Sequence, residues 1–345
     1  MSIASQRPQD NDFTVKIANV NGTGSASANS TLMKSLFRMG IPVCGKNYFP
    51  SNIQGLPTWY EIRVSAEGHL ARSGRVDVMV AMNAETYRKD HAEVAPGGYL
   101  IYDSTWPRSQ LFNRTDIHIL GVPLSRICNE NFDKARSRIL MKNIMYVGVL
   151  AALLDLDMDV IRQLLNEQFA AKASLLDANQ KAIDLGYGYA KENFSCPLPF
   201  RARTLDKTRD HIMIDGNTTA GLGCLFAGAT VGAWYPITPS TSLMDAFKKF
   251  CEKYRRDPET GKSNFCIIQA EDELSAIGMV LGASWNGARS FTPTSGPGIS
   301  LMNEFLGYGY FTEIPAVLFD VQRCGPSTGM PTRTQQADIM ACAYA

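Results

Sequence analysis

The second half of this chain repeats one arrangement four times: an apolar run, a short loop of Gly, Pro, Ser or Thr, and then a segment with helical periodicity. The loop regions read W-Y-P-I-T-P-S-T, Q-A-E-D-E-L-S-A-I-G, T-P-T-S-G-P-G and D-V-Q-R-C-G-P-S-T-G-M-P-T, and the first begins at Trp234. Buried strands that alternate with helices form open, mostly parallel sheets, and such sheets bind ligands at the carboxyl ends of their strands. The four loops are therefore predicted to surround one shared site.

The first half alternates in the same way. Strand-like runs, from V-K-I-A-N-V at Val15 to I-H-I-L-G-V at Ile117, are separated by loops or helical segments, the first of which is a helix from about Ser25 to Met39. Two long helical stretches follow, at residues 131–154 and 159–193. This pattern predicts an α/β fold with a second mostly parallel sheet that is covered by helices.

The chain is long enough for two domains. Residues 195–207 hold two prolines and no convincing period, which is typical of a linker. We expect the following parts: a disordered N-terminus over residues 1–12, a first domain over 13–194, a linker over 195–208 and a second domain over 209–345. The run H-I-M-I-D at residues 211–215 is predicted to be the first strand of the second domain. The final Q-Q-A-D-I-M-A-C-A-Y-A reads as a helix start with no stop signal, so we expect the chain to end inside its second domain.

Charge and hydropathy exclude several partners. The net charge is +1, the isoelectric point is near 7.5 and no basic run is present, which argues against nucleic acid and against an anionic membrane surface. The polar N-terminus lacks the apolar stretch of a secretory signal, so a cytoplasmic location is expected. The longest apolar run, Ile144–Leu154, is much shorter than the roughly 20 residues that span a bilayer, and a buried helix is predicted there.

No metal site is predicted on this chain. The eight cysteines stand alone without a C-x-x-C pair, and the four histidines are scattered, so neither zinc nor an iron–sulfur cluster has a plausible ligand set.

Together, Y-P-I-T-P-S, E-D-E, T-S-G-P-G and G-P-S-T-G resemble the thiamine-pyrimidine-binding, transketolase-like domain of 2-oxoacid:ferredoxin oxidoreductases and occur in the family order. Residues 13 to about 190 resemble the gamma domain that some of these enzymes fuse in front of it. The resemblance implies a fused gamma–alpha subunit of the 2-oxoglutarate synthase type, lacking its C-terminal part. The implied reaction is oxidative decarboxylation of 2-oxoglutarate to succinyl-CoA with thiamine diphosphate, coenzyme A and ferredoxin. Run in reverse, as in a reductive TCA cycle, it would fix carbon dioxide.

The resemblance also implies a partner. The chain has no G-D-G motif followed by the acidic and Asn residues of a magnesium-diphosphate site, so Mg²⁺, the diphosphate site and a [4Fe-4S] cluster are expected on a separate beta subunit, in a heterodimer or its dimer. Pyruvate, branched-chain or aryl 2-oxoacid specificity is the alternative within enzymes. A noncatalytic assembly subunit is the alternative outside them.

A carboxylate beside the aminopyrimidine ring is what thiamine chemistry requires, and a partly desolvated Glu at a strand-to-helix junction suits that task. Glu271, Asp272 and Glu273 compete for the role. Counted from Glu273, the small pairs Gly282-Ala283 and Gly287-Ala288 fall where small residues of the family helix fall, so Glu273 is preferred as the catalytic residue and Glu271 is the reserve. From the residues alone, all three could simply complement the dipole at a helix N-terminus.

The loop at 235–240 is expected by resemblance to face the substrate, with Tyr235 and Thr238 toward the 2-oxoacid and with Pro236 and Ile237 at the cofactor. Its two prolines hold the chain extended and aim the Thr238 hydroxyl. The alternative is a rigid turn with an N-cap at Ser240 or Thr241.

The T-S-G-P-G loop brings glycine backbone and a helix N-terminus to one point, which suits an anionic group, and Ser295 and Gly296 are expected cofactor contacts. The alternative is a tight turn with Pro297 at a helix start. Arg323 should emerge at the carboxyl edge of the sheet, where a guanidinium can hold a 2-oxoacid carboxylate through two hydrogen bonds. A structural role for this arginine is the alternative.

In the first domain, the turn N-G-T-G-S follows the first strand and opens a helix, as a phosphate-binding turn does. It lacks the third glycine of a dinucleotide fingerprint and the lysine of a P-loop, so NAD or ATP is not predicted, although a nucleotide-binding regulatory module is an alternative. By resemblance, Asn21, Gly22, Thr23, Gly24 and Ser25 are candidate contacts to coenzyme A. A purely structural turn is equally compatible. The loop Y-F-P-S-N-I-Q-G-L-P at 48–57 is a second candidate.

Overall fold

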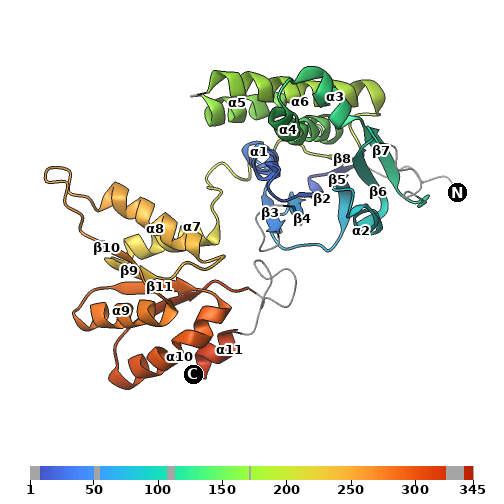
Figure 1. The fold of residues 1–345 in the computed structure, drawn as a ribbon. Helices are drawn as coiled ribbons and strands as arrows, with labels where there is room; N and C mark the ends of the chain where they lie inside the picture. Colours follow the sequence, from blue (N-terminus) through green and yellow to red (C-terminus); the bar gives the residue numbers. More distant parts are fainter. Residues whose placement is uncertain (1–7, 50–54, 107–112, 171, 324–337, 345) are drawn as a thin grey trace. The chain divides into compact units, whose positions relative to one another are not determined.

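The computed structural model describes residues 8–49, 55–106, 113–170, 172–323 and 338–344. The backbone separates into two compact units, with the boundary between Met213 and Ile214 (Figure 1). Each unit has its own sheet and its own apolar core.

The sheet of the first unit has six strands in the order β3-β4-β2-β5-β6-β7. The strands are β2 (Asp12–Val20), β3 (Val43–Tyr48), β4 (Pro57–Ser65), β5 (Val76–Ala81), β6 (Val94–Asp103) and β7 (His118–Val122). Strands β2, β5, β6 and β7 are parallel, while β3 and β4 form an antiparallel pair at one edge. The sheet is mostly parallel, as predicted.

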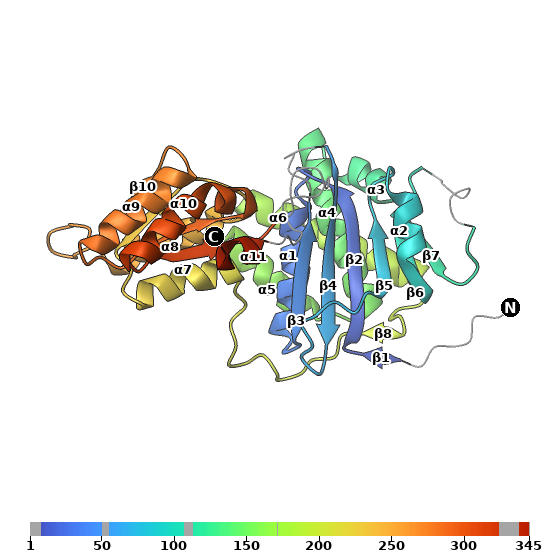
Figure 2. The same cartoon turned by 90° about the horizontal axis from the view of Figure 1, so that it is seen from below.

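Helices cover this sheet unequally. The helices of the unit are α1 (Ser25–Arg38), α2 (Tyr87–Glu93), α3 (Leu124–Asn131), α4 (Ala135–Leu154), α5 (Met158–Phe169) and α6 (Ala173–Asn193). In Figure 2 α1 and α4 lie behind the sheet, and α2 lies beside β5 and β6. The first long helical stretch predicted from the sequence, 131–154, is found as α4 with a later start at Ala135, whereas the second, 159–193, is divided between α5 and α6.

Helix α4 forms the centre of the first core. It is long and apolar enough to cross a membrane, but 72% of its apolar window is buried inside the unit. Every residue from Ile144 to Leu154 is buried, which confirms the predicted buried helix.

The N-terminal segment and the predicted linker differ from expectation. Strand β1 (Gln9–Asp10) pairs in parallel with β8 (Phe200–Arg201), so the residues just before β2 are not a disordered tail. The segment 195–208 is not a free linker, because Leu198, Phe200 and Ala202 alternate along it and bury their side chains in the first core. The period of two in these apolar side chains is typical of a strand and was hidden among prolines.

The second unit is built on four parallel strands in the order β10-β9-β11-β12. They are β9 (Val231–Trp234), β10 (Cys266–Gln269), β11 (Ser290–Thr294) and β12 (Val317–Asp320). The helices are α7 (Gly216–Phe226), α8 (Thr241–Tyr254), α9 (Glu273–Trp285), α10 (Gly296–Thr312) and α11 (Asp338–Ala343). The predicted strand at 211–215 is wrong: Ile212 is 76% exposed and the segment pairs with no strand in the described chain.

Two apolar layers lie on opposite faces of the second sheet. Phe247 of α8 packs edge-on against Phe291, which in turn packs against Phe319. On the other face Ile277 of α9 and Met302 of α10 form a smaller core. Figure 1 shows α7 and α8 on one side of the strands and α9 and α10 on the other, so the sheet is covered on both faces.

Candidate functional site

The strand order of the second unit reverses between β9 and β11. The chain leaves β9 through α8 to reach β10 on one side, and leaves β11 through α10 to reach β12 on the other. Loops that diverge in this way open a crevice at the carboxyl ends of the two strands, the usual ligand position in open α/β sheets. The predicted substrate loop, residues 235–240, follows β9 directly, and Ser295 follows β11 directly, so both lie at this crevice.

Three predicted site residues meet at one main-chain oxygen. Arg323 donates from Nη1 to the carbonyl oxygen of Thr238 at 3.0 Å, and the Ser295 hydroxyl donates to the same oxygen at 3.4 Å. Ser295 is the N-cap residue of α10, yet its hydroxyl makes no capping bond, and the residue is fully buried. Pro297 stands in the first turn of α10, as the alternative interpretation of this loop predicted. The loop is therefore both a helix start and part of the convergence.

The guanidinium of Arg323 has further hydrogen-bond donors besides Nη1. Its Nε is buried and has no hydrogen-bond partner within the described part of the chain. Since Nη1 is used by Thr238, the side-on pair Nε and Nη2 is the one that a planar carboxylate would engage. The G-P-S-T-G sequence that follows lies outside the described residues.

The three acidic residues at the start of α9, Glu271, Asp272 and Glu273, have different environments. Glu271 and Asp272 are exposed, whereas Glu273 is 7% exposed. Asp272 caps the helix by accepting from the backbone N–H of Ser275 at 2.7 Å, and this bond lowers the pKa of Asp272. Asp272 therefore has the role at the helix N-terminus that the dipole interpretation gave to all three acidic residues. Glu273, the first helical residue, is instead buried.

Glu273 lies against Gly298 and Thr294. A Cβ on Gly298 would stand 3.0 Å from Glu273 Cγ and 1.9 Å from Thr294 Oγ1. Thr294 is fully buried, and its hydroxyl has no hydrogen-bond partner in the described structure. A buried carboxyl side chain beside an unsatisfied hydroxyl is costly unless a further polar group joins them. These residues therefore fit a ligand with hydrogen-bonding ring atoms, such as an aminopyrimidine.

The remaining predicted residues of the substrate loop are more open. Tyr235 is 37% exposed, Pro236 and Thr238 are exposed, and Ile237 is half-buried. Thr238 makes its contacts through its carbonyl oxygen, rather than through the hydroxyl that the sequence analysis emphasised. Ser240 precedes α8 in the N-cap position, but its hydroxyl donates to the carbonyl of Ile237 at 2.8 Å instead of capping the helix.

Sequence reasoning missed two residues at this edge, Thr294 and Asp320. They are register neighbours at the ends of β11 and β12. Burial, with a contribution from nearby Asp338, raises the pKa of Asp320 to about 6. An acidic residue at the end of an apolar strand was the available signal for Asp320.

The first unit has a switch point of its own. Strand β2 leads through α1 to β3 on one side, and β5 leads through α2 to β6 on the other. The turn at residues 21–25 follows β2 there and opens α1, which has no side-chain cap. The loop at 235–240 in the second unit and the turn at 21–25 in the first unit thus each lie at the switch point of their own sheet, at the carboxyl ends of the strands.

The 21–25 turn is held by its own hydrogen bonds. Gly22 and Gly24 have φ angles of 86° and 84°, in the left-handed region that favours glycine. The Thr23 hydroxyl donates to the Val20 carbonyl at 2.8 Å, and Asn143 of α4 donates to the Thr23 carbonyl at 2.8 Å. These contacts fit a structural turn and also leave the first N–H groups of α1 uncapped for an anion. Half of the second candidate loop, residues 50–54 of 48–57, lies outside the described residues.

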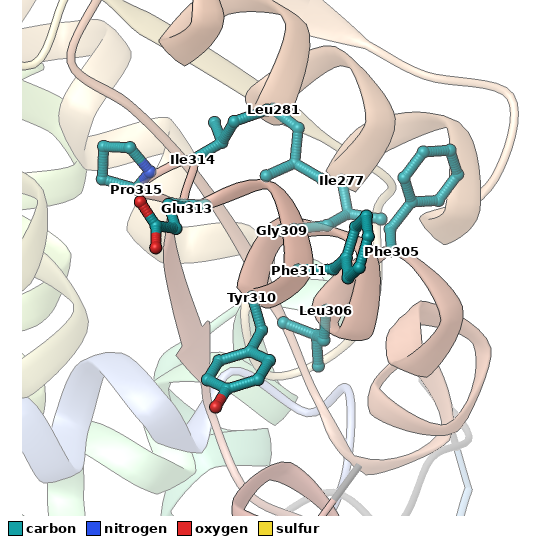
Figure 3. A pocket seen from close by; sticks show the side chains of 11 residues that line it. Ile277, Leu281, Phe305, Leu306, Gly309, Tyr310, Phe311, Glu313, Ile314 and Pro315 are labelled. Atoms are coloured by element: carbon teal, nitrogen blue, oxygen red, sulfur yellow. The ribbon is translucent and has the colours of Figure 1, made fainter.

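A pocket of about 620 Å³ in the second unit is separate from these sites (Figure 3). It lies between α9, the C-terminal half of α10 and the segment that enters β12, which places it toward the opposite edge of the sheet from Glu273. Among the residues that line it, Glu313 and Tyr310 are the two with ionisable side chains. We therefore assign the chemistry to the carboxyl edge and not to this pocket. Among the described residues, no three His, Cys, Asp or Glu side chains are grouped to hold a metal.

The fold and its two switch-point sites define a two-domain α/β ligand-binding protein. The sequence model of the pyruvate ferredoxin/flavodoxin oxidoreductase family matches residues 14–189, and that of the pyruvate flavodoxin/ferredoxin oxidoreductase thiamine diphosphate-binding domain matches residues 222–344. The chain belongs to the pyruvate ferredoxin/flavodoxin oxidoreductase family. The resemblance drawn from its loop motifs is confirmed.

Individual relatives agree with this assignment. The alpha subunit of 2-oxoacid:ferredoxin oxidoreductase 2 from Aeropyrum pernix is 29% identical over 95% of this chain and 58% of its own length. The 2-oxoglutarate oxidoreductase subunit KorA of Mycobacterium tuberculosis is 28% identical over 99% of this chain and 55% of its own length.

A solved structure supports the fold along the chain. The 2-oxoglutarate:ferredoxin oxidoreductase from Magnetococcus marinus, solved with 2-oxoglutarate, coenzyme A and succinyl-CoA bound, aligns with a TM-score of 0.84 and 30% identity. The alignment covers 96% of this chain and 56% of that one. The chain thus spans somewhat more than half the length of the relatives that it matches.

Proposed function

We propose that this chain is the fused gamma–alpha subunit of a 2-oxoacid:ferredoxin oxidoreductase and that its 2-oxoacid is 2-oxoglutarate. The observation that carries the proposal is the burial of Glu273 beside Thr294, at the edge of the sheet where Ser295 and Arg323 converge on Thr238. The names of the relatives, among them a 2-oxoglutarate oxidoreductase subunit, support the choice of substrate.

In the proposed reaction a 2-oxoacid anion and the thiol of coenzyme A give an acyl-CoA, carbon dioxide and one proton, and two electrons pass singly to ferredoxin. When bound, thiamine diphosphate supplies the electron sink that makes decarboxylation possible. A beta subunit is proposed to contribute the magnesium-diphosphate site and an iron–sulfur cluster, and the complex is proposed to be cytoplasmic.

Glu273 is the proposed acid–base residue. The residue is 7% exposed, and its carboxyl group makes no hydrogen bond with the described residues, so it can hold a proton at a ring nitrogen of the aminopyrimidine. Glu271 is exposed and lacks this burial.

Arg323 is proposed to bind the carboxylate of the substrate. The bond from Nη1 to Thr238 orients the guanidinium plane, and Nε and Nη2 remain for a bidentate contact. The Ser295 hydroxyl donates to the same carbonyl, and this second bond helps to fix the loop that carries Tyr235.

The turn at residues 21–25 is proposed to contact a phosphate group of coenzyme A through the uncapped start of α1. Calorimetric titration of the assembled complex with coenzyme A, ATP and NAD tests this proposal. Heat with coenzyme A that is lost in Gly24→Ala supports it. Heat only with ATP or NAD would instead support a nucleotide-binding regulatory module.

The function as a whole is tested by a substrate panel. The complex with its beta subunit is assayed with 2-oxoglutarate, pyruvate and a branched-chain 2-oxoacid, using a viologen dye as electron acceptor. We expect turnover with 2-oxoglutarate that depends on coenzyme A. Turnover with another acid only would overturn the substrate assignment. Turnover that survives Glu273→Ala would reduce this chain to an assembly subunit.

A further inference from the structure

The buried polar atoms behind Glu273 form an unusual set. On the face of the sheet that meets α9 and α10, the hydroxyls of Thr292 and Thr294 are both in fully buried residues, and neither has a hydrogen-bond partner in the described structure. The two residues are separated by one position on β11, so both side chains point to the same face. An unsatisfied buried hydroxyl destabilises a fold, whereas valine would fit each position without that penalty.

One of these hydroxyls, that of Thr294, lies beside a space that Glu273 also borders. Thr294 Oγ1 lies 1.9 Å from the point where a Cβ on Gly298 would stand, and Glu273 Cγ lies 3.0 Å from the same point. Gly298 is buried and has no side chain, so this space is left to the side chains of Thr294 and Glu273. Thr292 lies two residues earlier on β11, about 7 Å farther from the carboxyl edge of the sheet.

We propose that Thr294 is a positioning residue for Glu273, and that Gly298 is required because it leaves the space in which the two side chains meet. The Thr294 hydroxyl donates to the Glu273 carboxyl group when that group is engaged by its ligand, and it is left unsatisfied when the ligand is absent. This inference rests on the proposed function, because it names a further residue of the same site.

The proposal predicts opposite effects of one substitution in two states. Thr294→Val removes an unsatisfied hydroxyl, so it raises the melting temperature of the cofactor-free complex by about 2–4 °C. The same change removes a hydrogen bond to Glu273, so it weakens thiamine diphosphate binding and lowers kcat, each by about tenfold, with little change in the KM for the 2-oxoacid. A purely structural threonine would show no such opposition.

Matched variants separate the hydroxyl from its surroundings. Thr292→Val removes the equivalent hydroxyl one pleat away, so it is expected to raise the melting temperature and to leave thiamine diphosphate affinity unchanged. Thr294→Ser keeps the hydroxyl and is expected to retain affinity within about threefold. Gly298→Ala places a Cβ into the shared space, whereas a Cβ on Gly307 in the same helix meets no atom within 4 Å, so only the former should weaken binding.

The measurements are calorimetric titration of the cofactor-free complex with thiamine diphosphate, thermal melting and steady-state kinetics. Loss of affinity in Thr294→Val and Gly298→Ala, with retention in Thr292→Val and Thr294→Ser, supports the proposal. If Thr294→Val binds thiamine diphosphate as tightly as the wild type, Thr294 does not position Glu273. If the wild-type complex itself does not bind thiamine diphosphate, the proposed function fails instead, so the two failures can be told apart.

Discussion

Arg323 and Thr238 are 85 residues apart in the chain, yet the guanidinium of Arg323 donates to the main-chain carbonyl of Thr238 at 3.0 Å. The contact joins the loop after β9 to the segment after β12 across the carboxyl edge of the sheet. Ser295 reaches the same oxygen from the loop after β11. Residues from three of the four loop motifs therefore meet at the carbonyl oxygen of Thr238, and this meeting organises the proposed substrate site.

Arg323→Lys tests the proposed role of this guanidinium. Lysine keeps the positive charge but loses the planar fork, so the KM for the 2-oxoacid should rise about 10- to 100-fold with a smaller change in kcat. Arg255 is a suitable control, because it also donates to a main-chain carbonyl, that of Leu225 at 2.8 Å, and belongs to no predicted site. An unchanged KM in Arg323→Lys, measured with the dye-linked assay, contradicts the assignment.

Asp272→Ala tests how the helix that carries Glu273 is held. Asp272 caps α9 and Asp157 caps α5 of the first unit in the same way, so each alanine variant should lower the melting temperature by about 2–4 °C. Only Asp272→Ala should also weaken thiamine diphosphate binding, because only α9 carries Glu273.

The pKa of Asp272 is lowered by its capping bond, so the stabilisation from this carboxylate is present above the ordinary pKa of about 4 and is lost as the pH falls below it. The difference between wild type and Asp272→Ala should therefore shrink in acid. Thermal melting between about pH 3 and 7 checks this, and a difference that grows in acid would contradict the capping account.

Asp320 should make stability depend on pH in the opposite direction. Its pKa is raised to about 6 by burial, with Asp338 adding to the shift, so the protonated form is the one that the fold favours. The contribution is fully present below the ordinary pKa of about 4 and is lost as the pH rises through about 6. Asp320→Asn removes the ionisation, so its melting temperature relative to wild type should increase between about pH 4 and 7. Glu304→Gln, at an exposed position of α10, is the control and should show no such trend.

Gly24→Ala tests the turn of the first unit. Alanine in the left-handed region costs about 1–2 kcal/mol, and here the added Cβ would also stand 2.4 Å from Leu140 Cδ2. Gly68 has a similar φ angle of 79° with no atom within 4 Å of its Cβ position, so Gly68→Ala reports the conformational cost alone. Chemical denaturation should show a larger loss for Gly24→Ala. Equal losses would mean that the contact with Leu140 has no effect on stability.

Local sequence patterns predicted the elements that carry strong signals. The first helix, expected from about Ser25 to Met39, is found at Ser25–Arg38, because a helical period fills this segment. The short run at 211–215 was wrongly predicted to be a strand, because an apolar run becomes a strand only if a neighbouring strand pairs with it. Ile212 has no such neighbour within the described residues.

Contacts distant in sequence were harder to predict. The parallel sheet implied that Glu273, Ser295 and Arg323 would come to the same edge, because the carboxyl ends of all four strands meet there. It did not indicate that Arg323 and Ser295 would bind a main-chain oxygen of Thr238, because backbone carbonyls leave no mark in a sequence. The meeting of Thr294 and Glu273 over Gly298 likewise depends on the packing of α10 against α9, which no local pattern specifies.

The central claim is that the buried Glu273, and not its exposed neighbour Glu271, acts on the bound thiamine ring. The most direct test compares Glu273→Gln with Glu271→Gln in the assembled complex, measuring kcat for 2-oxoglutarate at saturating thiamine diphosphate. We predict that Glu273→Gln loses at least about 100-fold in kcat while Glu271→Gln stays within about threefold of wild type. Full activity in Glu273→Gln, or a large loss confined to Glu271→Gln, would contradict the account.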